Sequence, residues 1–343
     1  MRSKKPQAKN LITKNSPILV VGFGSIGQRH YRNLLSLGYV NVFVYDVDRS
    51  KLTSLGEKTI ESLNLKVLSG FTSVLVCNPS HLHVETALLA IMAGCNVFIE
   101  KPLAFSDKGI AALEQAAKKH KTTVMVACNY RFHAAYASLF KILKEKRLGK
   151  ALFANAEIRY DMRTARKGVD YRKSYASKAG QSGGVIYDSG SHVVDYLVDL
   201  FGVPTSVNAY TKNIVLETGL NDLAALELEF KGGIFSKIFL DLFSRTRRNF
   251  LEIECEQGTI RWDLFANSLT WSGVNKKQHT QYFYSNYADA EGRNQSYLAE
   301  LKYFFETCNG KKPPIAALSH ARTVTRVLER LVTSAQKGKR ILI

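Results

Sequence analysis

The sequence lacks the features that mark several special classes of protein. No apolar run approaches the roughly 20 residues of a membrane-spanning helix, and the first residues lack the apolar stretch of a signal peptide. The cysteines form no C-x-x-C pair and are odd in number, which favours reduced thiols that act as small hydrophobic side chains; they are Cys77, Cys95, Cys128, Cys255 and Cys308. These absences predict a protein of the reducing cytoplasm.

Acidic residues are scarce relative to basic ones. Against 48 Lys and Arg stand 29 Asp and Glu, which gives a formal net charge of +19. Such a surplus is compatible with nucleic acid, an anionic membrane surface or anionic small molecules as partners. Part of it lies in residues 1–16, which carry five basic residues and no acid, and we interpret them as a disordered basic arm.

Strand-like and helix-like segments alternate through residues 17–132. Strands alternating with helices imply parallel pairing with crossover helices, so we expect a Rossmann domain with a doubly wound parallel sheet. The short apolar runs that we interpret as its strands are residues 18–21, 42–45, 74–77, 97–99 and 124–127. Residues 56–72 are too short for the usual third strand of such a domain.

A different pattern follows a linking helix near residues 134–146. Apolar and polar residues alternate at 151–160 and in several segments between 204 and 272, which predicts antiparallel strands with one covered face. One segment so interpreted is "IFSKIFLDLF". Two helices, near 296–308 and 319–337, close the chain. We predict an α+β domain with a mostly antiparallel open sheet over residues 133–343, for substrate binding and oligomerisation, whose last helix packs back on the Rossmann domain.

The stretch "GFGSIG", residues 22–27, follows the first apolar run and precedes a helical pattern. In a Rossmann unit the first glycine permits a tight turn, the second lets backbone amides approach the pyrophosphate, and the third allows close helix packing. Three glycines alone also suit a simple turn. The residues expected to contact a dinucleotide are Gly22, Gly24, Ser25, Ile26 and Gly27.

Asp46 supports the dinucleotide interpretation, because an acid is expected about 20 residues after the loop to bind the adenosine ribose. It lies 19 positions after Gly27, at the end of the run "VFVY". An acid there repels the extra phosphate of NADP, so we expect NAD. Arg49, three residues later, keeps NADP as an alternative.

Two more specific patterns accompany the loop. Glu100-Lys101-Pro102 follows an apolar run, which places it at the carboxyl end of a parallel strand, where doubly wound sheets bind ligands. A lone lysine in such a place is ordinarily a solvated loop charge. Together with "NPSHLH" (residues 78–83) and "GGVIYDSGSHVVDYL" (residues 183–197), however, it resembles the glucose-fructose oxidoreductase and inositol dehydrogenase family, Gfo/Idh/MocA. The resemblance covers nearly the whole chain.

The resemblance implies a role for each matching position. Lys101 matches the family's active-site lysine, which contacts substrate and cofactor, and Asp188 and His192 match a D-x-x-x-H pair that the second domain brings to the site. The other cofactor contacts that it implies are Asn78, Pro79, His83 and Glu100. Those that it implies for substrate are Asn129 and Arg131, with Lys101, Asp188 and His192. Asn78, Ser80 and the Ser189-Gly190 pair depart from the commonest forms.

The residue types suit transfer of a hydride to or from a nicotinamide. Oxidising an alcohol needs a base for the hydroxyl proton, and histidine with a pKa near ~6.5 can move that proton. We expect His192 to be the acid/base, Lys101 to stabilise alkoxide charge and Asp188 to orient or bind substrate. Being four apart, Asp188 and His192 would share a helix face. A helix-capping Asp188 beside a half-buried His192 is the structural alternative.

Basic residues crowd the segment from Arg159 to Lys178, which in family members lies near the substrate entrance. Arg166 and Arg172 are our candidates there for a phosphate or carboxylate, although ordinary solvated charge explains them equally well. The local sequence resembles relatives in surface-polysaccharide and nonulosonic acid pathways. We therefore expect a sugar, sugar-nucleotide or amino-sugar substrate and, by resemblance, a homodimer or homotetramer.

Two other classes of function compete with this interpretation. A non-catalytic Rossmann protein that regulates or binds nucleic acid would suit the basic arm and the "SRTRR" stretch at 244–248, but aromatic residues are not interleaved for stacking. A metal site is not expected, because the His81-x-His83 pair near Cys77 supplies too few ligands. Glu252, Glu254 and Glu256 alternate along an expected strand and should face solvent.

Overall fold

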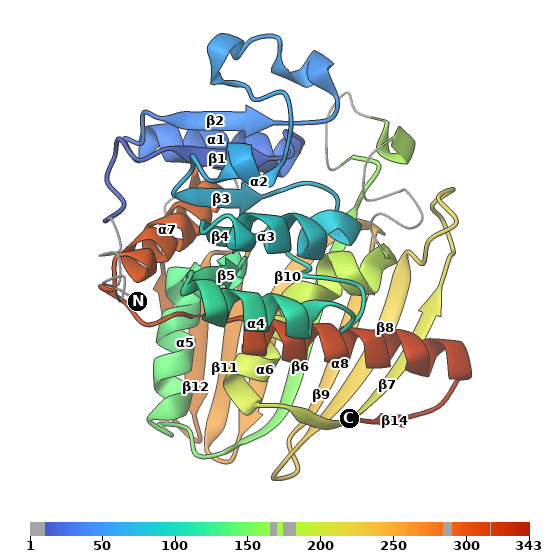
Figure 1. The fold of residues 1–343 in the computed structure, drawn as a ribbon. Coiled ribbons are helices and arrows are strands. Elements are labelled where there is room, and N and C mark those ends of the chain that lie inside the picture. The colour runs from blue at the N-terminus through green and yellow to red at the C-terminus, as the bar shows by residue number, and fades with distance from the viewer. Residues whose placement is uncertain (1–10, 165–169, 174–182, 284–289, 316) are drawn as a thin grey trace.

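The computed structural model describes residues 11–164, 170–173, 183–283, 290–315 and 317–343, and Figure 1 shows two sheets with helices packed against them. The first sheet is parallel, with strand order β2-β1-β3-β4-β5. Its strands are β1 (Ile18–Val21), β2 (Val42–Tyr45), β3 (Ser73–Val76), β4 (Asn96–Ile99) and β5 (Val124–Val126). The predicted Rossmann sheet is confirmed, with every strand within one residue of its expected range.

Both faces of this sheet are covered, which explains why its strands are apolar throughout. Along β1, Leu19 and Val21 join one core, whereas Ile18 and Val20 join another on the opposite face. The connecting helices are α1 (Ser25–Ser36), α2 (Leu65–Leu68), α3 (His83–Met92) and α4 (Ile110–His120), with 3-10 turns η1 (Arg49–Leu52), η2 (Gly56–Lys58), η3 (Ser80–Leu82) and η4 (Asn129–Phe132). Residues 56–72 contain η2 and α2 and no strand, as their length predicts.

The second sheet has strand order β13-β12-β11-β10-β6-β9-β8-β7-β14. Its neighbours pair antiparallel except for β6 and β9, so the mostly antiparallel sheet is confirmed. The strands are β6 (Ala151–Asp161), β7 (Pro204–Lys212), β8 (Leu223–Phe230), β9 (Phe235–Asp241), β10 (Phe243–Cys255), β11 (Gly258–Asp263), β12 (Ser268–Gly273), β13 (His279–Tyr282) and β14 (Ile341–Leu342).

One expected strand is two. The run "IFSKIFLDLF" is divided between β9 and β10, because the chain reverses at Leu242. The Asp241 carboxylate accepts hydrogen bonds from the backbone N–H groups of Phe243 (3.3 Å) and Ser244 (2.8 Å), which stabilises the reversal. The "SRTRR" stretch consequently belongs to β10. Along the same strand Glu254 is exposed, as is Glu256 just beyond it, and both face solvent as expected, whereas Glu252 is half-buried and pairs with Arg261 at 3.1 Å.

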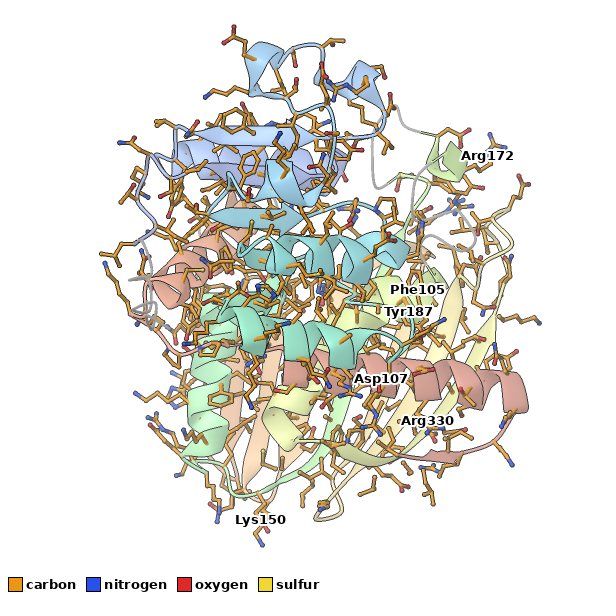
Figure 2. All side chains as sticks on the ribbon, in the orientation of Figure 1. Phe105, Asp107, Lys150, Arg172, Tyr187 and Arg330 are labelled. Carbon is orange, nitrogen blue, oxygen red and sulfur yellow. The ribbon has the colours of Figure 1, made fainter. Side chains whose placement is uncertain are left out.

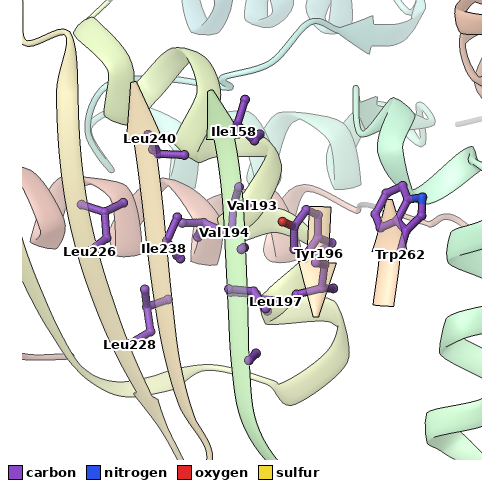
Figure 3. Packing of buried hydrophobic residues seen from close by; sticks show 14 of the residues in the cluster. Ile158, Val193, Val194, Tyr196, Leu197, Leu226, Leu228, Ile238, Leu240 and Trp262 are labelled. Carbon is purple, nitrogen blue, oxygen red and sulfur yellow. The ribbon is translucent and has the colours of Figure 1, made fainter. Parts of the chain in front are cut away.

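Helices cover one face of the second sheet. They are α5 (Ala134–Lys144), α6 (Ser191–Phe201) and α8 (Leu318–Lys337), while η5 (Tyr171–Lys173) and a turn of π-helix, η7 (Ile186–Gly190), lie in the connections. Figure 3 shows α6 side chains Val193, Val194 and Leu197 facing aliphatic side chains of β6, β8 and β9. Because this core fixes α6, it also fixes the residues on that helix's other face.

The last two helices return to the first half of the molecule. α7 (Ala290–Cys308) begins six residues before its expected start and contributes Leu301 and Phe304 to the core that contains Phe98. On α8, Arg322 forms ion pairs with Asp107 (2.6 Å) and Glu114 (3.0 Å). The ends of the chain thus complete the packing of the Rossmann sheet. Within the described ranges, no helix is both long and apolar enough to cross a membrane.

Candidate active site

The three glycines of the loop between β1 and α1 have different surroundings. Gly22 has φ +94°, and a Cβ there would lie 2.5 Å from the backbone N of Asn78. A Cβ at Gly27 would lie 1.9 Å from the carbonyl oxygen of Gly22. Around Gly24, by contrast, a Cβ would have nothing within 4 Å. Two glycines are therefore required by close backbone packing, and the middle one borders open space.

That open space lies at the amino terminus of α1. Gly24 is the N-cap residue and supplies no side-chain cap, and both Gly24 and Ser25 are exposed, with Ile26 half-buried. The first N–H groups of a helix lack partners within the helix and carry partial positive charge, so such an end attracts anions. The loop residues fit the pyrophosphate of a dinucleotide.

Asp46 directly follows β2 and is buried, with 7% of its surface exposed. Its carboxylate accepts hydrogen bonds from the backbone N–H groups of Phe23 (2.6 Å) and Asp48 (2.8 Å). Because Phe23 belongs to the glycine loop, Asp46 ties that loop to β2. It therefore lies beside the loop, where a ribose-binding acid is expected.

Lys101 lies beyond the end of β4 and reaches into the second half of the chain. Its ammonium group donates to the backbone carbonyl of Asp188 (2.9 Å) and to that residue's carboxylate (3.2 Å). The Tyr160 hydroxyl donates to the other oxygen of the same carboxylate at 3.3 Å. Asp188 lies on η7 and presents its carboxylate to Lys101, and Tyr160 of β6 holds the other oxygen of that carboxylate.

His192 lies on α6, one turn after Asp188, and stacks on Tyr130 with ring centroids 4.2 Å apart. The Tyr130 hydroxyl accepts a hydrogen bond from the Asn249 amide at 2.8 Å. Burial, together with the positive charge of Lys101, lowers the pKa of His192 well below its ordinary value. The imidazole is therefore neutral at pH 7 and able to accept a proton.

Glu100 precedes Lys101 in the chain, contacts its backbone and is nearly fully buried. Its carboxylate lies 2.6 Å from the His30 ring on α1 and accepts the Lys101 backbone N–H at 3.1 Å. Burial raises the pKa of Glu100, but the His30 hydrogen bond and the nearby positive charges outweigh it, so the pKa lies below its ordinary value. Glu100 thus links the backbone of Lys101 to α1, the helix that follows the glycine loop.

His83 connects the loop that follows β3 to the loop that follows β4. Its Nε2 lies 2.8 Å from the Asn78 carbonyl oxygen and its Nδ1 lies 2.9 Å from the Pro102 carbonyl oxygen. Only 1% of His83 is exposed, and burial lowers its pKa. Pro79 begins the intervening turn as the residue before η3. In this structure His83 holds the two loops together, and Asn78 and Pro79 lie just beyond the end of β3.

The expected substrate contacts after β5 lie in a different setting. Asn129 is buried and donates to the Ser296 hydroxyl at 3.4 Å. Arg131 forms an ion pair with Asp199 (2.5 Å) and approaches Asp195 (3.9 Å), both on α6. Two carboxylates of α6 thus pair with the guanidinium group, and Arg131 fixes η4 against the helix that carries His192. Its contact with substrate stays a prediction.

The basic segment is only partly described, since Arg166 lies outside the described residues. Arg172, on the exposed surface of η5 (Figure 2), pairs with Asp170 at 3.0 Å and approaches Glu217 at 3.6 Å. Arg159 pairs with Asp241 and Arg163 with Asp161, at 2.7 and 2.8 Å. Acidic partners therefore offset the arginine charge of the described part of this segment.

Three polar residues of the site were not identified from the sequence: Tyr130, Tyr160 and Asn249. Tyr130 lies between the expected substrate residues Asn129 and Arg131, and Tyr160 is the last residue of the alternating segment 151–160, so the sequence pointed to the neighbourhood of both. Burial raises the pKa of both phenols, and both hydroxyls therefore remain protonated at neutral pH. Asn249 lies about 90 residues after Tyr160 and offered no signal.

Two family models match the chain. Residues 17–128 match the model described as "Oxidoreductase family, NAD-binding Rossmann fold". Residues 136–261 match the model described as "GFO/IDH/MocA C-terminal domain". The two matches together cover more than half of the chain.

Among curated proteins, the chain is similar to scyllo-inositol 2-dehydrogenase (NADP(+)) IolW of Bacillus subtilis (strain 168). The two are 30% identical over 136 residues, which is 40% of this chain and only 36% of the relative's length. Among solved structures, the chain is similar to levoglucosan dehydrogenase in complex with NADH and levoglucosan, with a TM-score of 0.83 at 19% identity. The match covers 96% of this chain and 99% of that chain.

A second solved structure is the WlbA dehydrogenase from Bordetella pertussis in complex with NADH and UDP-GlcNAcA. It has a TM-score of 0.78 at 19% identity and covers 96% of this chain and 99% of its own. At such identities these likenesses show a common fold. They extend over both sheets.

Proposed function

Because this chain belongs to the GFO/IDH/MocA oxidoreductase family, with residues 17–128 as its NAD-binding Rossmann domain, we propose that it is an NAD(P)-dependent dehydrogenase or reductase acting on CH–OH groups of a sugar or polyol. The observation that carries the proposal is the ion pair between Lys101, which follows a strand of the first sheet, and Asp188, which precedes α6 by one turn of helix and lies four residues before His192. Lys101 follows the carboxyl end of β4, the edge at which doubly wound sheets bind ligands.

Each of the three side chains has a distinct part in the proposed reaction. A bound nicotinamide would accept the hydride of an alcohol or supply one to a ketone. His192, neutral because of burial and the Lys101 charge, takes the hydroxyl proton onto a ring nitrogen. The Lys101 ammonium stabilises the negative charge that develops on the oxygen. In the opposite direction, protonated His192 returns the proton.

Asp188 positions Lys101 in this scheme. The carboxylate and the carbonyl of the same residue both accept from the ammonium group, and Tyr160 holds the second carboxylate oxygen. Such a clamp fixes a flexible lysine side chain before substrate binds, which reduces the entropy lost on reaching the transition state.

A sugar-derived substrate such as a sugar nucleotide or amino sugar is our finer proposal. It is supported by the sequence resemblance around residues 170–192 and by the fold shared with a dehydrogenase crystallised with UDP-GlcNAcA. The many arginines between Arg159 and Lys178 favour an anionic substrate. The described ones already pair with acidic side chains, however, so they support it less strongly. The same sequence resemblance supports our proposal that the protein acts in a surface-polysaccharide or amino-sugar pathway.

We also propose that the protein pairs through the uncovered face of the second sheet. On that face the rings of Phe153 and Phe235 stack with centroids 6.1 Å apart and are only partly buried. Aromatic side chains in such a position suit a subunit interface. A monomer in sedimentation velocity at micromolar concentration would contradict this arrangement.

Titration of the protein with NADH, followed by nucleotide fluorescence, tests the proposed function first. Wild-type protein should bind NADH at micromolar concentration and then turn over members of a panel of sugars, polyols and sugar nucleotides. Lys101→Met should keep NADH binding within a few-fold but lower the turnover rate about 100- to 1,000-fold, as loss of an electrostatic stabiliser does.

Lys108→Met is the matched control, because Lys108 is an exposed lysine seven residues further along the same connection. It should behave as wild type in both measurements. Absence of NADH binding by wild type would refute the cofactor assignment. Turnover by Lys101→Met within a few-fold of wild type would refute the role of the lysine.

A further inference from the structure

Strand β10 contains a bulge beside the proposed active site. Its residues 244–247 lie opposite a single residue of β6, Tyr160, whose hydroxyl contacts the Asp188 carboxylate at 3.3 Å. The pairs that flank the bulge are Phe243 with Asp161 and Arg248 with Arg159. Bulges re-aim side chains and are frequent next to active sites. Residues 244–247, which we call the β10 bulge, therefore adjoin the residue that holds Asp188.

A buried carboxylate fixes the start of the β10 bulge. Asp241 is 0% exposed and accepts hydrogen bonds from the Ser244 N–H and from the Ser244 hydroxyl, both at 2.8 Å. The same carboxylate pairs with Arg159 at 2.7 Å. The bulge thus starts from a position that is set before any ligand binds, which reduces the ordering cost of binding.

The acidic side chains around the β10 bulge already have arginine partners. Asp161 accepts two hydrogen bonds from Arg163, both at 2.8 Å. Glu157 lies 3.6 Å from Arg159 and 3.5 Å from Arg248. The local charged residues are the acids Glu157, Asp161 and Asp241 and the arginines Arg159, Arg163, Arg245, Arg247 and Arg248. Positive charge is therefore in excess at this edge of the second sheet.

Arg245 and Arg247 account for the excess. Both are exposed, and within the described ranges neither guanidinium group has a carboxylate within 4 Å. The Arg163 hydrogen bonds lower the pKa of Asp161, and Arg245 adds a smaller effect from a longer distance. A guanidinium group can bind a carboxylate or a phosphate through two parallel hydrogen bonds. The β10 bulge thus offers two such groups to a ligand.

We infer that Arg245 and Arg247 bind an oxyanion of the substrate, a carboxylate or a phosphate carried by the sugar, while its hydroxyl or keto carbon reacts beside Lys101 and His192. A neutral sugar would leave both guanidinium groups in water, so an anionic sugar gains contacts that a neutral one lacks. This inference rests on the proposed function, because it specifies the substrate class of the same site. It assigns this role to residues other than Arg172, which pairs with acids.

Titration of the protein with inorganic phosphate and, separately, with D-glucuronate tests the inference. The arginine Nε–Hε signals in NMR spectra report the binding, and D-glucose is the uncharged comparison. At least one anion should shift the Arg245 and Arg247 signals saturably with a Kd below about 10 mM, and glucose should shift neither. Saturation by phosphate alone would assign a phosphate, and saturation by glucuronate alone a carboxylate. Absence of saturable shifts with both anions would overturn the inference.

The variants Arg245→Gln and Arg247→Gln assign the signals, and each should weaken anion binding at least about fivefold. Arg248→Gln is the matched control, because Arg248 is the next residue of β10, is exposed and pairs with Glu157. It should change anion binding by less than about twofold. Equal losses in Arg248→Gln would assign the binding to general surface charge and would also contradict the inference.

The split between KM and kcat separates this inference from the proposed function. For an anionic sugar that the protein turns over, Arg247→Gln should raise KM at least about fivefold and leave kcat within about threefold, as loss of uniform binding does. Turnover of neutral sugars, with no preference for their anionic counterparts, would refute the inference and leave the proposed function standing. Saturable anion binding at both arginines in a protein that binds no NADH would overturn the proposed function and leave the anion site standing.

Discussion

Replacing Gly24 by alanine should separate cofactor binding from folding. Gly24 has φ −69° and ψ −171°, which alanine adopts readily, and a methyl group there meets nothing within 4 Å. Alanine is a poorer N-cap than glycine by a few tenths of a kcal/mol or more, whereas the loss of backbone freedom in the unfolded chain gains about 0.4–1 kcal/mol. The free energy of unfolding should therefore change by less than about 1 kcal/mol.

The same methyl group would occupy the space beside the α1 amino terminus. An extra methyl in a well-packed contact costs about 1–3 kcal/mol, so NADH affinity should fall about 5- to 150-fold at 1.4 kcal/mol per factor of ten. Nucleotide fluorescence gives the affinity, and urea denaturation of the same preparation gives the free energy of unfolding.

Gly22→Ala and Gly27→Ala provide the contrast. At Gly22 the positive φ costs alanine about 1–2 kcal/mol, and the methyl also overlaps the Asn78 backbone; at Gly27 it overlaps the Gly22 carbonyl. Both variants should lose at least about 3 kcal/mol of unfolding free energy. If Gly24→Ala binds NADH as wild type does, or if Gly22→Ala folds with wild-type stability, the reasoning from this loop is refuted.

Two further predictions concern the helix α6. Burial and Lys101 lower the pKa of His192, so its imidazole should stay neutral as the pH falls past the ordinary histidine value near 6.5; NMR titration, with His192→Gln to assign the signal, checks this, and protonation at or above pH 6.5 would contradict it. Arg131→Met removes the cation that pairs with two half-buried carboxylates, Asp199 and Asp195, which keep their contacts with Tyr136 and His320, and it should lower the free energy of unfolding by about 1.5–3 kcal/mol. Arg147→Met, which breaks an exposed pair with Glu145, should cost less than about 1 kcal/mol in the same urea experiment, and equal losses would argue against the anchoring role of Arg131.

Short-range patterns in the sequence were sufficient for the framework of the molecule. The Rossmann strands could be located because strands buried on both faces must be apolar at every position. The position of Lys101 followed from the same argument, since a residue beyond a parallel strand lies at the ligand-binding edge. The approach of Lys101 to Asp188 agrees with the resemblance, but its hydrogen bonds required the structure, because the two residues are 87 positions apart.

Long-range charge pairing was beyond the sequence. The ion pair of Arg131 could not be predicted, because its partner Asp199 lies 68 positions away on a helix whose orientation no local pattern determines. Likewise, the turn at Asp241 depends on a carboxylate that caps two backbone N–H groups, and the apolar run across it resembles one strand. Tyr160 had an alternating pattern around it, but alternation does not show which side chain reaches Asp188.

The return of α7 to the first sheet bears on how the protein is made in the cell. Phe304 packs in the same core as Met125 of β5, yet it is synthesised about 180 residues later, which at about 5–20 residues per second is a delay of roughly 10–40 s. During that interval the nascent nucleotide-binding half exposes one apolar face to the surroundings of the ribosome. A premature stop codon between the glycine loop and α7 therefore yields a chain that has every residue of that loop but an unfinished core.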